Sequence, residues 1–363
     1  MSRDASGHKY VKKCYLMCNR IIAIFFLLLL CAGASCAKKI YQVAYPNLYD
    51  QKYDSEFPYK SCSKELESVV NVIKKVNCTA FYEAYVFDEA SLLTLEDAVD
   101  VKKHAVDKIF YNSSVAGTAT VIYYQDRYVG LLTCAHIVDF PDTMITYIKK
   151  PGLPKETYLQ SIAFKKRHSF YVHDLSHQGE CKILAMDLDL DVALLGLRML
   201  SAEPHQMPVL EYPMGRAKEL EWGSFVYLVG YPLGYQMITK GIVSNPNRDR
   251  KGGFLIDSLF NEGFSGGIVL AVRDGVPNFE LVGIATAVSA DYRPVLSLHP
   301  DDHAEKYDPY VPYKGEVYVN VQKEINYGIT HVISIEEIVN FIEKNHKKMR
   351  NKGYDFSHLF FEK

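Results

Sequence analysis

The stretch N-E-G-F-S-G-G, residues 261–267, contains the serine whose surroundings decide the fold. Two patterns fit it. In G-x-S-x-G the serine stands on a sharp turn that leads from a strand into a helix. In G-x-S-G-G it stands in a tight corner that a strand follows. Both interpretations make Ser265 a nucleophile, but they require a different order of partners along the chain and a different structure after Gly267.

The order of the partners separates the two patterns. A serine hydroxyl is a weak nucleophile, so it needs an imidazole to accept its proton and a carboxylate to orient that imidazole. His136 ends the apolar run L-L-T-C-A-H, and Asp191 directly precedes V-A-L-L. An α/β-hydrolase has the order serine, acid, histidine, and no histidine after Ser265 stands in a supporting motif. The order histidine, aspartate, serine and the strand-like I-V-L-A-V after Gly267 favour the second pattern.

Short β-branched or apolar runs begin near residue 115 and predict strands. The polar stretch 201–221 divides them into two sets, which predicts a pair of antiparallel β-barrels with the site in the crevice between them. Helical spacing between 64 and 110 predicts an N-terminal helical extension, and I-E-E-I-V-N-F-I-E-K predicts a C-terminal amphipathic helix.

At this point T-C-A-H, D-V-A-L-L and N-E-G-F-S-G-G resemble the three signatures of chymotrypsin-fold, trypsin-like serine peptidases. V-G-Y-P-L-G (229–234), G-I-V-S (241–244) and L-V-G-I-A-T-A (281–287) resemble the DegP/HtrA branch, although we expect no PDZ domain. The resemblance covers roughly 113–345. It implies an all-β core of two antiparallel six-stranded barrels and a serine endopeptidase that works through an acyl-enzyme, without cofactor or metal.

The resemblance also implies a role for each matching residue. His136 is the general base and later the acid, Asp191 orients its Nδ1–H, and Ser265 forms the acyl-enzyme. The backbone N–H groups of Gly263 and Ser265 form the oxyanion hole. Thr286 supports the aspartate through its hydroxyl. Digestive relatives have an aspartate just before the nucleophile, whereas this chain has phenylalanine, so activation by a new N-terminal ammonium is not expected.

Substrate-binding residues follow from the same alignment. Leu259 and Phe260 fall at the base of the specificity pocket, and Thr286 and Ala287 fall on the strand beside it. Neither residue at the base is acidic, which argues against a preference for lysine or arginine before the cleaved bond. We expect a small or medium apolar side chain there.

The N-terminus predicts export. Basic residues precede the apolar run 21–34, which is shorter than the ~20 residues of a membrane span and fits a secretory signal. Three outcomes remain open. Cleavage before Cys36 gives a lipoprotein acylated on that cysteine, cleavage after Ala37 gives a soluble protein, and an uncleaved segment gives an anchor. Each of them predicts an extracytoplasmic location, in the periplasm or at the cell surface, and cleavage after Ala37 predicts a secreted protein.

The predicted organisation has five parts: a signal at 1–36, an N-terminal extension at 37–112, a first barrel at 113–205, a second barrel with the C-terminal helix at 206–345, and a tail at 346–363. A Tyr-, Asp- and Pro-rich insertion at 289–324 interrupts the second barrel. The net charge of −2 gives no electrostatic reason to bind nucleic acid. We expect a polypeptide substrate, membrane contact only through the N-terminus, and an oligomeric state that the sequence leaves open.

Three alternatives stay open. The first is a catalytically latent binding module, in which Phe264, the 37–110 segment or the 289–324 insertion closes the cleft. The second is an esterase or lipase, which requires a helix after Ser265. The third is that Asp187 or Asp189, rather than Asp191, is the carboxylate that orients His136, since all three stand in the same D-L-D-L-D segment.

Overall fold

The computed structural model describes residues 49–98, 100–150, 157–175, 178–201, 207–298, 310–312 and 317–360. The predicted signal segment and Cys36 lie outside these residues. The chain divides into two compact units at Lys52, and every helix and strand discussed below belongs to the unit Tyr53–Lys363. None of the helices that the structure describes is long and apolar enough to cross a membrane.

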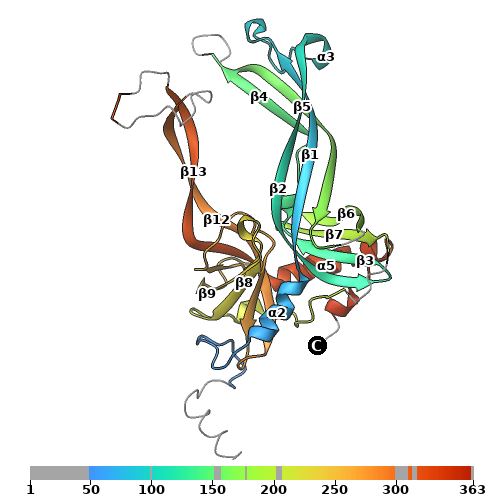
Figure 1. Cartoon of the computed structure of the whole chain (residues 1–363), viewed down its shortest axis with the longest axis vertical. Helices are drawn as coiled ribbons and strands as arrows, with labels where there is room; N and C mark the ends of the chain where they lie inside the picture. The colour runs from blue at the N-terminus through green and yellow to red at the C-terminus, as the bar shows by residue number, and fades with distance from the viewer. Residues whose placement is uncertain are drawn as a thin grey trace, which may run out of the picture. The chain divides into compact units, whose positions relative to one another are not determined.

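The first half of this unit is a seven-stranded antiparallel sheet with the order β4-β5-β1-β2-β3-β7-β6. Its strands are β1 (Ile73–Phe87), β2 (Ala105–Gln125), β3 (Tyr128–Thr133), β4 (Thr143–Lys149), β5 (Thr157–Val172), β6 (Gln178–Asp187) and β7 (Val192–Met199). The one-turn helix α4 (Ala135–Val138) follows β3 directly. Figure 1 shows the outer parts of β1, β2, β4 and β5 extending beyond the packed core.

The second half is a closed antiparallel barrel with the order β10-β13-β12-β11-β8-β9. Its strands are β8 (Phe225–Gly230), β9 (Met237–Asn245), β10 (Phe254–Ile256), β11 (Ile268–Val272), β12 (Phe279–Leu298) and β13 (Val317–Ser334). The helices outside the sheet are α2 (Ser63–Val72), α3 (Val101–His104) and α5 (Ile335–Arg350), with short 3₁₀ turns at Glu89–Ser91, Ala217–Glu219, Pro232–Gly234 and Ser357–Leu359.

The prediction of two six-stranded barrels is confirmed only for the second half. A barrel closes when its first and last strands pair, but the edge strands β4 and β6 of the first sheet each pair with one neighbour. The first half is therefore an open half-barrel. The core is mostly β, as predicted, and the whole agrees with a chymotrypsin-like fold.

The prediction of helices between 64 and 110 is corrected by the structure. Among the described residues of this range, only α2, the four residues of α3 and the 3₁₀ turn Glu89–Ser91 are helical, and residues 73–87 and 105–112 are strands. The missed signal is an alternation in β1, where Val76, Cys78 and Ala80 are buried and the residues between them are not. That period of two belongs to a strand with one face on a core. The predicted C-terminal helix is confirmed as α5.

Much of the predicted insertion is a two-stranded ribbon. β12 and β13 pair from Ala290 opposite Ile325 to Leu298 opposite Val317. Leu296 and Val319 face each other across the ribbon and are both largely exposed. The ribbon therefore extends the barrel beyond its core, and none of the ribbon side chains whose burial the structure describes is buried.

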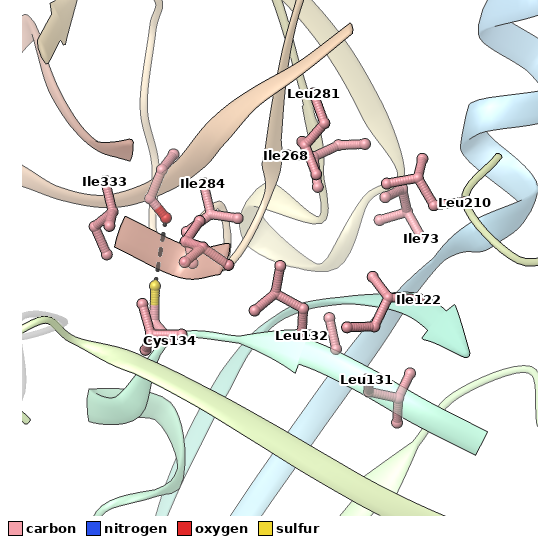
Figure 2. Packing of buried hydrophobic residues seen from close by; sticks show 14 of the residues in the cluster. Ile73, Ile122, Leu131, Leu132, Cys134, Leu210, Ile268, Leu281, Ile284 and Ile333 are labelled. Carbon is pink, nitrogen blue, oxygen red and sulfur yellow. Dashed lines mark hydrogen bonds between the residues drawn. The ribbon is translucent and has the colours of Figure 1, made fainter. Parts of the chain in front are cut away.

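The sheet and the barrel share one hydrophobic core. Figure 2 shows side chains of the sheet, including Ile122, Leu131 and Leu132, facing side chains of the barrel, including Ile268, Leu281 and Ile284. Burying a side chain of this size contributes roughly 1.5–3 kcal/mol. This core holds the two halves together, and with them the residues that each half contributes to the site.

The segment after α5 packs on the sheet at two glycines. A Cβ on Gly130 of β3 would lie 2.7 Å from the ring of Phe356, and a Cβ on Gly196 of β7 would lie 2.7 Å from the ring of Tyr354. Both aromatic residues are buried. The two glycines therefore leave the space in which the aromatic rings pack against the backbone of the sheet.

Gly130→Ala tests this packing. We expect it to lower the free energy of unfolding by about 1–3 kcal/mol, because the new methyl group overlaps the Phe356 ring. In a Phe356→Ala background the same change should cost clearly less, because the ring is gone and only Tyr123 Cβ, 3.0 Å from the new methyl group, remains close. Urea unfolding of the four proteins measures both values. Equal costs in the two backgrounds would show that the ring does not require the glycine.

Candidate active site

His136 lies on α4, immediately after the strand that was predicted to release it. Its ring Nδ1–H donates to Asp191 Oδ2 at 2.8 Å, and its backbone N–H donates to Asp191 Oδ1 at 2.9 Å. The histidine side chain is 45% exposed and the aspartate side chain 26%. The carboxylate thus holds the ring by Nδ1, which leaves Nε2 as the proton acceptor and open to solvent.

Asp191 ends the turn before β7 with its backbone in the left-handed region, at φ +60°. Its backbone C=O accepts from the N–H of Ala135, so α4 is attached to this turn by main chain as well as side chain. Burial raises the pKa of the Asp191 carboxyl, but hydrogen bonds from His136 and Thr286 outweigh it, and the pKa lies below its usual 3.8. The carboxyl is therefore an anion at neutral pH.

Asp187 and Asp189 do not take this role. Asp187 Oδ1 accepts from the N–H of Leu190 within the same turn, at 2.9 Å. Asp189 lines a neighbouring cavity. Thr286 of β12 donates its Oγ1–H to Asp191 Oδ2, which is the position that the family resemblance implied for it.

Ser265 lies in the loop between β10 and β11 and reaches the same strand as Thr286. Its Oγ–H donates to the backbone C=O of Thr286 at 3.0 Å. Within the described part of the chain, Ser265 Oγ and His136 form no hydrogen bond. The serine must therefore change its rotamer before His136 can accept its proton, as is common in sites without substrate. Strand β11, rather than a helix, follows Gly267, and this removes the esterase alternative.

All five carbonyl groups of the loop 261–265 are engaged. Asn261 accepts from Phe264 N–H, Glu262 from Leu233 N–H at 2.7 Å, and Phe264 from Gly267 N–H. Gly263 O accepts from Thr118 Oγ1 at 2.6 Å, and Ser265 O accepts from Thr118 N–H at 2.8 Å. These bonds fix the direction of every peptide plane in the loop.

The N–H groups of Gly263 and Ser265 have no acceptor among the described residues. Glu262 C=O and Gly263 N–H belong to the same peptide group and point in opposite directions. Because Glu262 O accepts from Leu233 N–H, the Gly263 N–H points away from Leu233. Gly263 has φ +100°, and a Cβ there would lie 2.3 Å from the C=O of Tyr231. Only glycine fits this position. The loop therefore presents two free donors beside Ser265 Oγ, as an oxyanion hole does.

Thr118 is the residue that the sequence analysis missed. It lies on β2 of the sheet, yet it holds Gly263 and Ser265 of the barrel by the two bonds above, and its Oγ1 also accepts from Tyr231 N–H at 2.9 Å. Thr133 Oγ1 donates to Thr118 O at 2.7 Å. The only local signal is the G-T-A-T run at 117–120, which reads as an ordinary strand start.

The two residues predicted to form the base of the specificity pocket differ in their exposure to solvent. Leu259 is 63% exposed, whereas Phe260 is 4% exposed and its ring packs on Phe264 at 5.8 Å between centroids. Phe264 is itself 2% exposed. Phe260 and Phe264 thus anchor the loop in the core, and Leu259 is the one of the two predicted pocket-base residues that a substrate can touch. The backbone of Ala287 pairs with His331 in the barrel.

Cys134 lies beside the site, but its side chain is fully buried. The ligand atoms of Cys134, His136 and Asp191 lie within 4.8 Å of one another, as those of a metal site would. Burial raises the pKa of the Cys134 thiol well above its usual range, and its Sγ–H donates to Ala285 O (Figure 2). His136 Nδ1 already donates to Asp191. The three groups thus fit a protonated thiol packed under a histidine–aspartate pair rather than a set of metal donors.

A cavity of about 450 Å³ borders the site. Thr286 lines it together with Asp189 and Leu190 from the turn before Asp191. Its charged lining is mixed: Arg248, Arg250 and Lys251 stand with Asp189, Asp249 and Glu337. This volume is in the range of ligand pockets in proteins, and the recess lies beside Thr286, whose hydroxyl donates to Asp191.

Comparison with known proteins agrees with this geometry. Residues 117–284 match the family model described as a trypsin-like peptidase domain. None of the curated proteins matches the chain. The match begins on β2 and ends on β12, so it includes His136, Asp191 and Ser265. A trypsin-like peptidase domain supports a serine peptidase in general.

Thr286→Val tests the support of Asp191 through the pH dependence of stability. The pKa of Asp191 is lower in the folded protein than the 3.8 of a free aspartate. The ionised carboxylate therefore stabilises the fold fully above pH 3.8, and this stabilisation is lost as the pH falls through the pKa of the folded protein. Without the Thr286 hydroxyl the folded pKa rises. We expect the variant to be less stable by about 1–2 kcal/mol near neutral pH, with the difference shrinking at about pH 3.

Urea unfolding at both pH values measures this difference. Thr286→Ser keeps the hydroxyl and should restore the wild-type profile. Thr330→Val is the matched control, because Thr330 is a buried threonine whose Oγ1 donates to Ser258 O and contacts no carboxylate. A pH-independent loss in Thr286→Val would contradict the prediction.

Proposed function

We propose that the protein is an exported serine endopeptidase, nearer the DegP/HtrA branch than the digestive enzymes. The trypsin-like peptidase domain at 117–284 is the premise. The observation that supports activity best is the loop 261–265, in which every carbonyl is bonded and the N–H groups of Gly263 and Ser265 are free. A latent site would have no reason to keep both donors unoccupied.

The reaction follows from these groups. His136 Nε2 takes the proton of Ser265 Oγ as that oxygen attacks the carbonyl carbon of the peptide bond. The N–H groups of Gly263 and Ser265 donate to the developing oxyanion, while Asp191 balances the charge of the imidazolium. His136 then gives its proton to the leaving amine. Water, activated by the same imidazole, hydrolyses the acyl-enzyme.

We propose a substrate with an apolar side chain before the cleaved bond. Leu259 is the exposed residue at the predicted base of the pocket, and its side chain is apolar. Beside it, the backbone of Thr286 and Ala287 on β12 can pair with an extended peptide. We further propose that the N-terminal signal delivers the protein outside the cytoplasm, with either a lipid on Cys36 or release after Ala37.

One observation favours a second candidate, a latent binding module. Ser265 Oγ donates to Thr286 O rather than to His136, so the serine is not activated in this arrangement. Phe264 is not the group that would close the cleft, because its ring is buried in the core. The two functions differ in whether Ser265 reacts, and that can be measured directly.

Covalent labelling with a fluorophosphonate, followed by intact mass, distinguishes them. We expect a single adduct on the purified protein, none on Ser265→Ala, and labelling slowed by several orders of magnitude in His136→Ala. Ser297→Ala is the control, because Ser297 lies on the exposed ribbon and donates to Tyr318 O. A folded wild-type protein that stays unlabelled would support the latent module instead.

Gly263→Ala tests the oxyanion hole separately. Its methyl group would meet Tyr231 O, so the Gly263 peptide must turn and its N–H moves from the site. We expect labelling roughly 10²–10³-fold slower. Gly223→Ala is matched, since Gly223 also has positive φ but has nothing within 4 Å of the new Cβ. If Gly223→Ala slows labelling as much as Gly263→Ala does, strain at a positive φ explains the slower labelling, and the donor role of the Gly263 N–H is wrong.

A further inference from the structure

A cavity of about 680 Å³ lies where the segment after α5 packs on the first sheet. β3, β6 and β7 contribute residues to its lining, and Tyr354 contributes an aromatic wall. None of the residues that line it belongs to the candidate active site. The cavity therefore needs an explanation of its own.

The charged residues that line this cavity are all basic: Arg127, Lys182, Arg198 and Lys352. Among the residues that the structure describes there, no aspartate or glutamate lines it. The chain as a whole has a net charge of −2, so this concentration does not reflect a basic protein. Arg127, Arg198 and Lys352 around one space raise the local positive potential, and a bound anion relieves it.

Two of the walls are fixed by packing. The Arg198 guanidinium lies over the Tyr128 ring at 5.5 Å from its centroid. The Tyr354 ring lies where Gly196 has no side chain. A guanidinium held on an aromatic face keeps its edge free to donate two parallel hydrogen bonds to a phosphate or carboxylate. The packing thus orients the Arg198 guanidinium at the cavity wall.

Arg127 gives an independent indication. It follows Asp126 in the two-residue turn between β2 and β3. Asp126 has φ +50° and Arg127 has φ +70°. Turns of this kind strongly prefer asparagine followed by glycine. Arginine is strained there, and strain of this kind is retained at functional positions. The Arg127 side chain reaches the end of β7, where it donates to Leu200 O at 3.4 Å, and it lines the cavity.

We propose that this cavity binds a phosphate-class anion of at least two negative charges. Arg127, Arg198 and Lys352 are its donors. This inference is independent of the proposed peptidase activity, since the two sites share no residue.

Calorimetric titration of the full chain with pyrophosphate at low salt is the first test. We expect saturable binding that weakens as salt rises, and Arg198→Gln should weaken it about tenfold or more. The control is Lys102→Gln/Lys103→Gln, which removes two exposed cations outside the cavity and should leave the affinity within about twofold. No binding by the wild type, or equal weakening by the control, would overturn the proposal.

Arg127→Gly separates binding from structure. Glycine relieves the strained turn, so we expect a higher melting temperature together with weaker pyrophosphate binding. A rise in melting temperature without loss of affinity would show that Arg127 does not bind the anion. Vesicles with and without phosphatidic acid then identify the source. If the protein co-sediments with the phosphatidic acid vesicles and Arg198→Gln abolishes this, the anion is a lipid headgroup. If the protein binds pyrophosphate but does not co-sediment with the vesicles, the anion is a soluble phosphate.

Discussion

The bonds from Thr118 to the nucleophile loop are the constraint on which the rest of the site depends. One residue of the open sheet holds two residues of the barrel loop, through its N–H to Ser265 O and its Oγ1 to Gly263 O. The free N–H groups of Gly263 and Ser265 belong to the two neighbouring peptides, whose carbonyls accept from Leu233 N–H and Gly267 N–H. Thr118 therefore anchors the residues that carry the free donors, while bonds within the barrel set the direction of the donors themselves. The two halves of the molecule are thereby aligned by hydrogen bonds at the candidate active site, in addition to the apolar core that they share.

The two halves contribute different kinds of function. The sheet builds the histidine–aspartate pair almost entirely from local chain, since α4 and the turn before β7 are bonded through both main chain and side chain. The barrel contributes Ser265 and the N–H groups of Gly263 and Ser265 through the loop 261–265. Thr286 links the two halves, because its hydroxyl donates to Asp191 and its carbonyl accepts from Ser265 Oγ.

The sequence predicted what depends on local pattern and failed where distant segments decide. His136, Asp191 and Ser265 stand in short motifs with a fixed chain order, and α5 has a clean helical period. Thr118 has no motif, because its importance comes from a loop far along the chain that bonds to it. The open edge of the first sheet depends on whether β4 and β6 pair, which no local feature determines. The alternation in β1 was visible, but the neighbouring helical stretch outweighed it.

The left-handed backbone of Asp191 narrows the residues that this position can accept. Its φ of +60° is tolerated by aspartate, asparagine and glycine far better than by other residues. The proposed mechanism requires a carboxylate, and glutamate is disfavoured by that backbone. Asparagine or glycine would keep the turn intact but would remove the carboxylate. Under the proposed mechanism, a related protein with either residue at this position is therefore expected to keep the fold and to lack peptidase activity.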